Sequence, residues 1–115
     1  VHAMREAAGY LVGEHDFKSF CSIHAQVETT VRRIYALTVD KKEDIITIRI
    51  TGNGFLYNMV RIIAGTLIRV GTGEYKPEQI PEILAAKDRE MAGPTAPAHG
   101  LTMIGIEYED LEEKS

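Results

Sequence analysis

The chain has 115 residues, of which 44% are hydrophobic and 26% are charged, with ten glycines, one cysteine and no tryptophan. These values are typical of one globular domain and exclude a disordered or fibrous chain, and no apolar run approaches the roughly 20 residues of a membrane-spanning helix. The single cysteine, Cys21, excludes an internal disulfide and a cysteine-rich zinc site, and it favours a reducing cytoplasm.

The formal net charge of −4 argues against strong binding of nucleic acid by bulk electrostatics. Residues 107–115 hold five acidic residues and one lysine, so residues 1–106 carry twelve acidic and twelve basic side chains. We therefore expect one domain over residues 1–108 and an acidic C-terminal tail over residues 109–115 that extends into solvent. Because the sequence begins at Val1 in a helix-like segment, without a signal peptide, we expect it to be a piece of a longer protein.

The first segment is predicted to be an amphipathic helix. Residues 2–12 place apolar side chains three or four positions apart, and Gly13 is a plausible end. Asp16 is then a candidate N-cap for a short helical turn that directs Phe17 and Phe20 into the core. Residues 21–29 show neither helical nor strand periodicity, so we expect a loop there.

Two strands are predicted next. Residues 30–39 are rich in β-branched and aromatic side chains, and Tyr35, Leu37 and Val39 alternate with their neighbours, which indicates a period of two. A polar turn over residues 40–44 leads to a second strand, residues 45–51. Its isoleucines at positions 46, 48 and 50 share one face. The simplest pairing of these two strands is an antiparallel hairpin.

The segment that follows is a predicted strand, glycine turn and helix. Gly52-Asn53-Gly54 permits a sharp turn with positive φ, and the helix presents buried positions at Phe55, Met59, Ile63, Leu67 and Val70. The unpartnered N–H groups of the first helical turn predict a site for an anion or a carboxylate. Arg61, a permanent cation on this helix, is the first candidate for binding a carboxylate or phosphate near the glycine turn. The alternative is that Arg61 is a surface arginine whose stem lies along apolar residues.

The last third of the chain completes an α+β pattern. Gly71 and Gly73 are predicted to end the helix, and Pro77 is placed at the first position of another helix with a core stripe. Residues 92–100, with two prolines, predict a stiff, shaped loop, and residues 101–108 alternate as a strand. We expect an α+β domain with an antiparallel or mixed sheet.

Familiar catalytic constellations are not found in the sequence. The four histidines have no metal-ligand spacing with one another or with Cys21, so we predict no metal. Gly52 and Gly54 lack the third glycine of a dinucleotide-binding turn, because Tyr57 occupies that position. Cys21 is predicted to be a small buried thiol rather than a nucleophile.

The segment Gly52–Arg61, followed by Gly65-Thr66-Leu67 and Val70-Gly71-Thr72-Gly73, resembles the signature of the bacterial tRNA pseudouridine synthase A family. The match extends to His15-Asp16-Phe17 with Phe20, to Ala85–Arg89, and to Ala92–Ala98 with Gly100-Leu101. It covers nearly the whole chain in order and looks like the C-terminal half of such an enzyme. The resemblance implies one half of a pseudouridine synthase fold, with helices packed on one face of the sheet.

The resemblance also implies isomerisation of uridine in the anticodon arm of tRNA, without a metal or organic cofactor, by a cytoplasmic enzyme that is typically a homodimer. The catalytic aspartate of the family lies in an Arg-Thr-Asp-x-Gly motif of the N-terminal half, which is absent here. By motif match, Arg61 pairs with that aspartate, Leu56 is an apolar wall of the uracil pocket, and Phe55 or Gly54 shapes it. Lys87 and Arg89 are candidates for contact with RNA at the rim.

Two functions remain open from the sequence. The first is half of an RNA-modifying enzyme, inactive alone because the catalytic aspartate is absent. The second is a non-catalytic α+β module that binds an anion or RNA at the glycine turn. The presence or absence of an Arg-Thr-Asp-x-Gly motif upstream of Val1 in the full gene distinguishes them.

Overall fold

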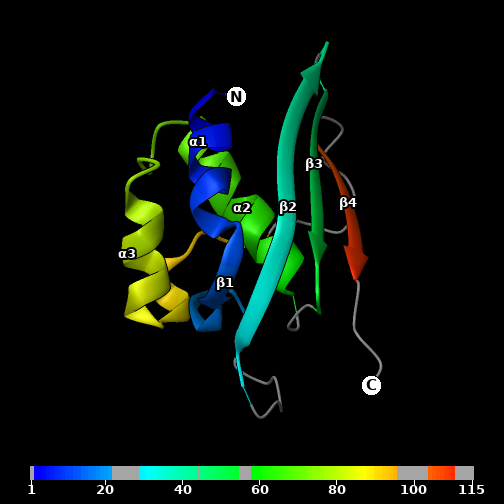
Figure 1. Ribbon diagram of the computed structural model, residues 1–115. Helices are drawn as coiled ribbons and strands as arrows, with labels where there is room; N and C mark the ends of the chain where they lie inside the picture. The colour runs from blue at the N-terminus through cyan, green and yellow to red at the C-terminus, as the bar shows by residue number, and fades with distance from the viewer. Residues whose placement is uncertain (1, 22–28, 44, 55–57, 96–103, 111–115) are drawn as a thin grey trace.

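A computed structural model of the protein describes residues 2–21, 29–43, 45–54 and 58–95, and the backbone of residues 104–110. The helices lie on one side of the sheet (Figure 1). In chain order, the elements are α1 (His2–Leu11), β1 (Gly13–Asp16), the 3-10 helix η1 (Lys18–Phe20), β2 (Val31–Lys42), β3 (Ile45–Gly52), α2 (Met59–Gly71), α3 (Gln79–Ala86), the 3-10 helix η2 (Arg89–Met91) and β4 (Ile104–Asp110).

The described strands form one mixed sheet in the order β1-β2-β3-β4. β1, β2 and β3 pair antiparallel, as the hairpin prediction requires, and β4 pairs parallel with β3. The hairpin turn is tighter than predicted, because Lys42 pairs with Ile45 and Glu43 takes a positive φ of 56°. The α+β class, the mixed sheet and the helical layer on one face are therefore confirmed.

β2 contains an irregularity that interrupts the predicted alternation. Ile34 pairs with Gly52 whereas Ala36 pairs with Thr51, so Tyr35 is an extra residue between two pairs. Such a bulge changes the phase of the side chains along the strand. Leu37 is buried and Tyr35 is 47% exposed, although simple alternation places both on one face.

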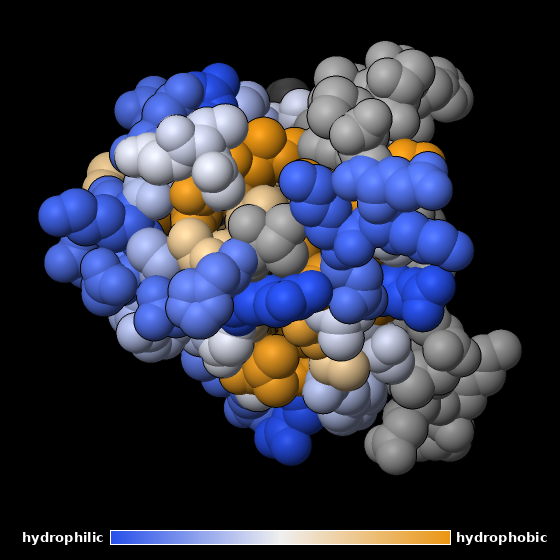
Figure 2. Space-filling view, turned by 90° about the horizontal axis from the view of Figure 1, so that it is seen from above, coloured by the Kyte–Doolittle hydropathy of each residue, from blue (hydrophilic) through white to orange (hydrophobic). Residues whose placement is uncertain are grey.

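The core lies between the sheet and the helices. Viewed from above, hydrophobic residues are visible between hydrophilic residues on either side (Figure 2). Ile48 and Ile50 of β3 are buried, as the period of two predicts, while Ile46 is partly buried. The buried positions of the helices include Met4, Ala7, Ala8 and Leu11 of α1, Met59, Ile63, Leu67 and Val70 of α2, and Ile80, Ile83 and Leu84 of α3.

Two helix starts differ from the prediction. α2 begins at Met59, not at the predicted core position Phe55, because Asn58 takes a left-handed conformation with φ 60° that a continuing helix does not allow. α3 begins at Gln79 rather than at Pro77. Gln79 bonds back to Lys76 through both its N–H and its side-chain carbonyl, so a turn precedes the helix.

Two further differences concern the strands. The short strand β1 was not predicted, since the period-two signal of four residues containing Gly13 is weak. β4 continues through Glu109 and Asp110, which pair with Thr51 and Gly52 and were predicted as the start of the tail. The boundary at residue 108 stays a prediction. None of the helices in the described ranges has the length and apolar character needed to cross a bilayer.

Candidate active site

The glycine turn is bound to the sheet by the residue between its two glycines. Gly52 is buried at the end of β3 and pairs with Ile34. The backbone N–H of Asn53 donates to the Arg33 carbonyl at 3.0 Å, and its side-chain oxygen accepts from the Arg33 N–H at 2.8 Å. Gly54 then has a φ of 139°, a conformation that excludes most side chains. The turn therefore leaves the sheet in a fixed direction.

The described part of the chain resumes at Asn58, at the start of the helix that carries Arg61. The Asn58 carbonyl accepts from the Ile62 N–H at 2.9 Å, which forms the first helical hydrogen bond. Nη1 of Arg61 donates to Oδ1 of Asn58 over 3.4 Å, a long contact that orients the guanidinium toward the start of α2. Arg61 is half-buried, which fits both a partner for a carboxylate and the alternative of a surface arginine whose stem lies along apolar residues.

Of the three residues predicted to form the uracil pocket, the structure describes one. Gly54 is described and takes the positive φ that the turn requires. Phe55 and Leu56, the predicted walls of the uracil pocket, lie outside the described residues, as does Tyr57. The site-binding roles of Gly54, Phe55 and Leu56 stay predictions. The N–H groups that were predicted to bind an anion belong to the first turn of the helix. Because α2 starts at Met59, that turn does not follow Gly54 directly.

The two predicted RNA-contacting cations have different surroundings. Lys87 ends α3 with a left-handed φ of 50° and is exposed, with Nζ 3.8 Å from the Asp16 carboxylate. Arg89 is half-buried, and Nη1 donates to the Gly93 carbonyl at 2.9 Å while Nη2 donates to Oγ1 of Thr95 at 3.2 Å. Arg89 is thus bonded to its own chain, whereas the Lys87 ammonium faces solvent beside one carboxylate.

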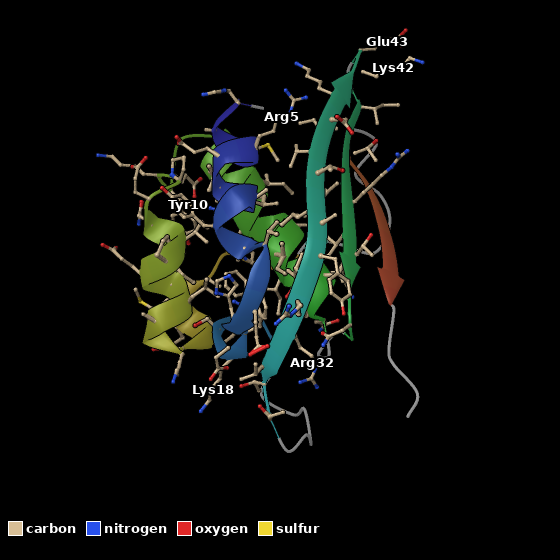
Figure 3. The ribbon with its side chains drawn as sticks, in the orientation of Figure 1. Arg5, Tyr10, Lys18, Arg32, Lys42 and Glu43 are labelled. Carbon is tan, nitrogen blue, oxygen red and sulfur yellow. The ribbon has the colours of Figure 1, made fainter. Side chains whose placement is uncertain are left out.

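Basic side chains elsewhere are spread over the molecule. Lys18 and Arg32 lie at one end of the molecule, and Arg5 and Lys42 lie toward the other (Figure 3). Arg5 is 3.7 Å from the carboxylate of Asp40. These labelled cations therefore do not form one basic face, in agreement with the balanced charge of residues 1–106.

The described aspartates with visible side chains have structural partners. Asp16 accepts from the Lys18 N–H at 3.1 Å and from the Thr30 hydroxyl. Asp88 accepts from the Glu90 N–H at 3.0 Å and caps η2. Asp40 pairs with Arg5. Asp88 is thus a cap and Asp40 a surface pair. The predicted N-cap role of Asp16 is wrong, because the N-cap of η1 is Phe17, which makes no side-chain cap, and Asp16 lies one residue earlier.

Cys21 behaves as a buried thiol. Its side chain is 6% exposed and donates to the Lys18 carbonyl at 3.4 Å. Burial, with the nearby Asp16 carboxylate, raises the pKa of the Cys21 thiol, and the thiol form is a poor nucleophile. Within the described ranges, no cluster of histidine, cysteine, aspartate and glutamate has the composition of a metal site.

Sequence reasoning missed three polar residues that organise this region. Asn53 binds β2, Ser19 is a fully buried hydroxyl next to α3, and Thr66 is a fully buried hydroxyl on α2. Such residues can be predicted from the sequence where a polar side chain occupies a position that the apolar period places in the core. A hydroxyl buried there needs a hydrogen-bond partner. Thr66 in the apolar stripe of α2 and Ser19 before Phe20 both fit that pattern.

Comparison with known proteins agrees with this arrangement. The family model described as tRNA pseudouridine synthase matches residues 7–109. A protein of Brevibacillus brevis named tRNA pseudouridine synthase A is 59% identical over 108 residues, which cover 94% of this chain and 44% of that protein. The proteins of the same name from Bacillus pumilus and Bacillus subtilis are 54% and 52% identical, over 93% and 96% of this chain.

The chain spans less than half the length of these relatives, with 43% of the Bacillus pumilus protein and 44% of the Bacillus subtilis protein covered. The matched range runs from the second half of α1 to the last but one residue of β4, and it includes the glycine turn, Arg61 and residues 92–95. The family resemblance inferred from the motifs is confirmed: the chain belongs to the tRNA pseudouridine synthase family.

Proposed function

We propose that this chain is the C-terminal, cleft-forming half of a tRNA pseudouridine synthase, which isomerises uridine to pseudouridine in the anticodon stem-loop. The observation that carries the proposal is the family match over residues 7–109. The position of Arg61 supports it, because the arginine is half-buried in the first turn of α2, shortly after a glycine turn held by Asn53.

Arg61 serves as the partner of a catalytic aspartate supplied by the N-terminal half of the protein. An ionised aspartate beside an apolar pocket for a base is unfavourable unless a fixed cation compensates it. A guanidinium binds a carboxylate through two donors in a planar fork, and so it sets both the orientation and the charge of that carboxylate. The contact between Arg61 and Asn58 orients the fork before the aspartate arrives.

The substrate uridine is bound as a flipped-out nucleotide. A base inside a stacked helix is inaccessible, so an enzyme that changes it must extrude it into a pocket with apolar walls. Gly54, Phe55 and Leu56 form part of this pocket, and the exposed Lys87 contacts the RNA backbone at its rim. The glycosidic bond from the ribose to N1 breaks, the base turns, and C5 is joined to the ribose; C5 loses its proton and N1 gains one. The product has the atoms of the substrate, so the reaction consumes no cofactor.

The partners of the chain follow from this assignment. The N-terminal half of the same protein completes the cleft, and the 115-residue chain alone is inactive for lack of the aspartate. The complete enzyme is a cytoplasmic homodimer that acts on the anticodon arm of tRNA. The dimer places two complete clefts in one particle.

The test is an assay of pseudouridine formation in unmodified tRNA by the full-length protein that contains this chain. Arg61→Lys keeps the charge and removes the fork, so we expect a loss of at least about 100-fold in the rate of formation at anticodon-arm uridines. Arg33→Lys is the matched control, because the Arg33 side chain forms an exposed pair with Glu14 at 3.1 Å. We expect that variant to keep its activity.

Near-normal activity of Arg61→Lys would contradict the paired role of the fork. Absence of any pseudouridine with the unchanged full-length protein, together with binding of tRNA, would indicate a non-catalytic binding module instead. Mixing the 115-residue chain with the separately produced remainder of the protein tests the division of the cleft. Activity in the mixture but in neither part alone is the expected result.

A further inference from the structure

We propose that Arg89 is a positioning residue that, together with Thr66, fixes the 93–95 segment (Gly93, Pro94 and Thr95) against the helix that carries Arg61. The proposal rests on the proposed function for its catalytic consequence. It assigns to Arg89 a different role from the contact with RNA predicted from the sequence, and it leaves that contact to Lys87.

The first set of contacts comes from the Arg89 guanidinium. It donates to the Gly93 carbonyl at 2.9 Å and to the Thr95 hydroxyl at 3.2 Å, so two donors hold both ends of the 93–95 segment. Arg89 is half-buried, and a charged donor makes stronger hydrogen bonds than a neutral one. If the guanidinium moved to a phosphate, the Gly93 carbonyl and the Thr95 hydroxyl would lose these partners. The geometry therefore favours the internal role.

The second set of contacts comes from Thr66 in α2. Its buried hydroxyl donates to the Ile62 carbonyl at 2.9 Å and accepts from the Gly93 N–H at 2.9 Å. Both backbone polar groups of Gly93 are therefore held, the N–H by α2 and the carbonyl by Arg89.

The position of Arg89 is itself set by two side chains. The Ser19 hydroxyl donates to the Ile83 carbonyl at 2.7 Å and accepts from the Asp88 N–H at 2.8 Å. The Asp88 carboxylate then caps η2 by accepting from the Glu90 N–H. The start of η2 is therefore bound to the end of α3, and Arg89, as the first residue of η2, is directed at the 93–95 segment.

The functional consequence follows from α2. This helix carries Arg61 in its first turn and Thr66 further along, so the Thr66–Gly93 hydrogen bond fixes the 93–95 segment relative to the helix that holds Arg61. Small misplacements of groups around a reacting centre lower rates strongly, by about 100-fold for 1 Å in unfavourable cases. Arg89 and Thr66 act on the reaction through this position and without contact to the substrate.

The first experiment measures amide hydrogen exchange at Gly93 in the 115-residue chain, which needs no activity. Thr66→Val removes the acceptor at nearly constant shape, and Arg89→Met removes the donors. We expect Gly93 exchange to accelerate about 3- to 10-fold in Thr66→Val, the range for loss of one hydrogen bond, and to accelerate also in Arg89→Met, because the Gly93 carbonyl then loses its charged donor. Thr66→Ser keeps the hydroxyl and is expected to match the unchanged chain.

The second experiment measures single-turnover rates and tRNA affinity over a range of salt concentrations in the full-length protein. For a positioning role, Arg89→Met and the uncharged change Thr66→Val both lower the rate by about 10- to 100-fold, with unchanged affinity and salt dependence. Arg89→Lys restores part of the rate, because an ammonium can reach one acceptor at a time. Lys87→Met is the reference for a phosphate contact and reduces the salt slope by about one.

The proposal is overturned if Arg89→Met weakens tRNA binding and reduces the salt slope as Lys87→Met does, while Thr66→Val keeps its rate. It is also overturned if exchange at Gly93 is the same in all variants. If the unchanged full-length protein forms no pseudouridine, the proposed function fails, and the exchange experiment still decides whether Arg89 and Thr66 fix the segment.

Discussion

Thr66 of α2 and Gly93 of the segment after η2 are in backbone contact as well as hydrogen-bonded. The Thr66 hydroxyl accepts from the Gly93 N–H at 2.9 Å, and a Cβ built on Gly93 would lie 2.8 Å from the Thr66 Cα. A backbone atom cannot move aside as the end of a flexible side chain can. The residue at position 93 is therefore restricted to glycine by packing against a helix 27 positions earlier in the chain.

Gly93→Ala is expected to destabilise the protein by about 1–3 kcal/mol, the usual cost of overpacking a well-packed site. Gly9→Ala is the matched control, because Gly9 lies in α1 and a Cβ there meets nothing within 4 Å. That change is expected to stabilise by about 0.5–1 kcal/mol, since alanine favours a helix over glycine. Urea unfolding of the two variants measures both values, and equal effects of the same sign would contradict the contact.

Ser19→Ala is expected to cost about 1–3 kcal/mol. The Ser19 hydroxyl is fully buried and bonds both the Ile83 carbonyl and the Asp88 N–H, so its removal leaves two groups without this partner. Thr72→Ala removes an exposed hydroxyl that donates to the Arg69 carbonyl at 3.1 Å, and its effect should stay within about 0.5 kcal/mol. Thermal or urea unfolding compares them, and a similar small loss for both would show that the Ser19 contacts contribute little.

Tyr35→Ala and Leu37→Ala separate the bulged strand from a regular one. Leu37 is 8% exposed, so truncation should cost about 2–5 kcal/mol, whereas Tyr35 is 47% exposed and its truncation should cost less than about 1 kcal/mol. A strand with strict alternation places both side chains on the same face and predicts similar losses. Free energies of unfolding from urea titrations, at unchanged m-value, decide between the two.

Cys21 is expected to react slowly with alkylating reagents in the folded protein. Burial and the Asp16 carboxylate raise its pKa, so the folded state keeps the proton at a pH where the unfolded state has released it. The resulting stability is fully present below the unfolded pKa of about 8.5 and is lost as the pH rises through the higher folded pKa. Iodoacetamide labelling at pH 8, with and without urea, measures the protection. Equal rates in both conditions would contradict it.

The measurement that isolates the thiol is the pH dependence of unfolding of Cys21→Ala. This variant should lose the decrease in stability above about pH 8.5 that the unchanged protein shows. An identical decrease in both proteins would assign the effect to other groups.

Local periodicity predicts the parts of the fold that depend on neighbours in sequence. The buried stripes of α1, α2 and α3 follow from apolar residues three and four apart, and the β2–β3 hairpin follows from two alternating runs around a polar turn. The start of α2 was predicted too early, because the left-handed conformation of Asn58 leaves no signal in an apolar pattern. The four residues of β1 also show no local pattern, because β1 is defined by its pairing with β2, which is distant in the sequence.

The sequence by itself determined the α+β class, the family and the candidate role of Arg61, because helical and strand periods and an ordered motif are properties of nearby residues. The tertiary structure alone decided which polar groups meet across long separations. Ser19 bonds Asp88 over 69 positions, Thr66 bonds Gly93 over 27, and Asn53 bonds Arg33 over 20. A buried hydroxyl or amide must find a partner, but its identity depends on how the helices pack on the sheet, which no local pattern specifies.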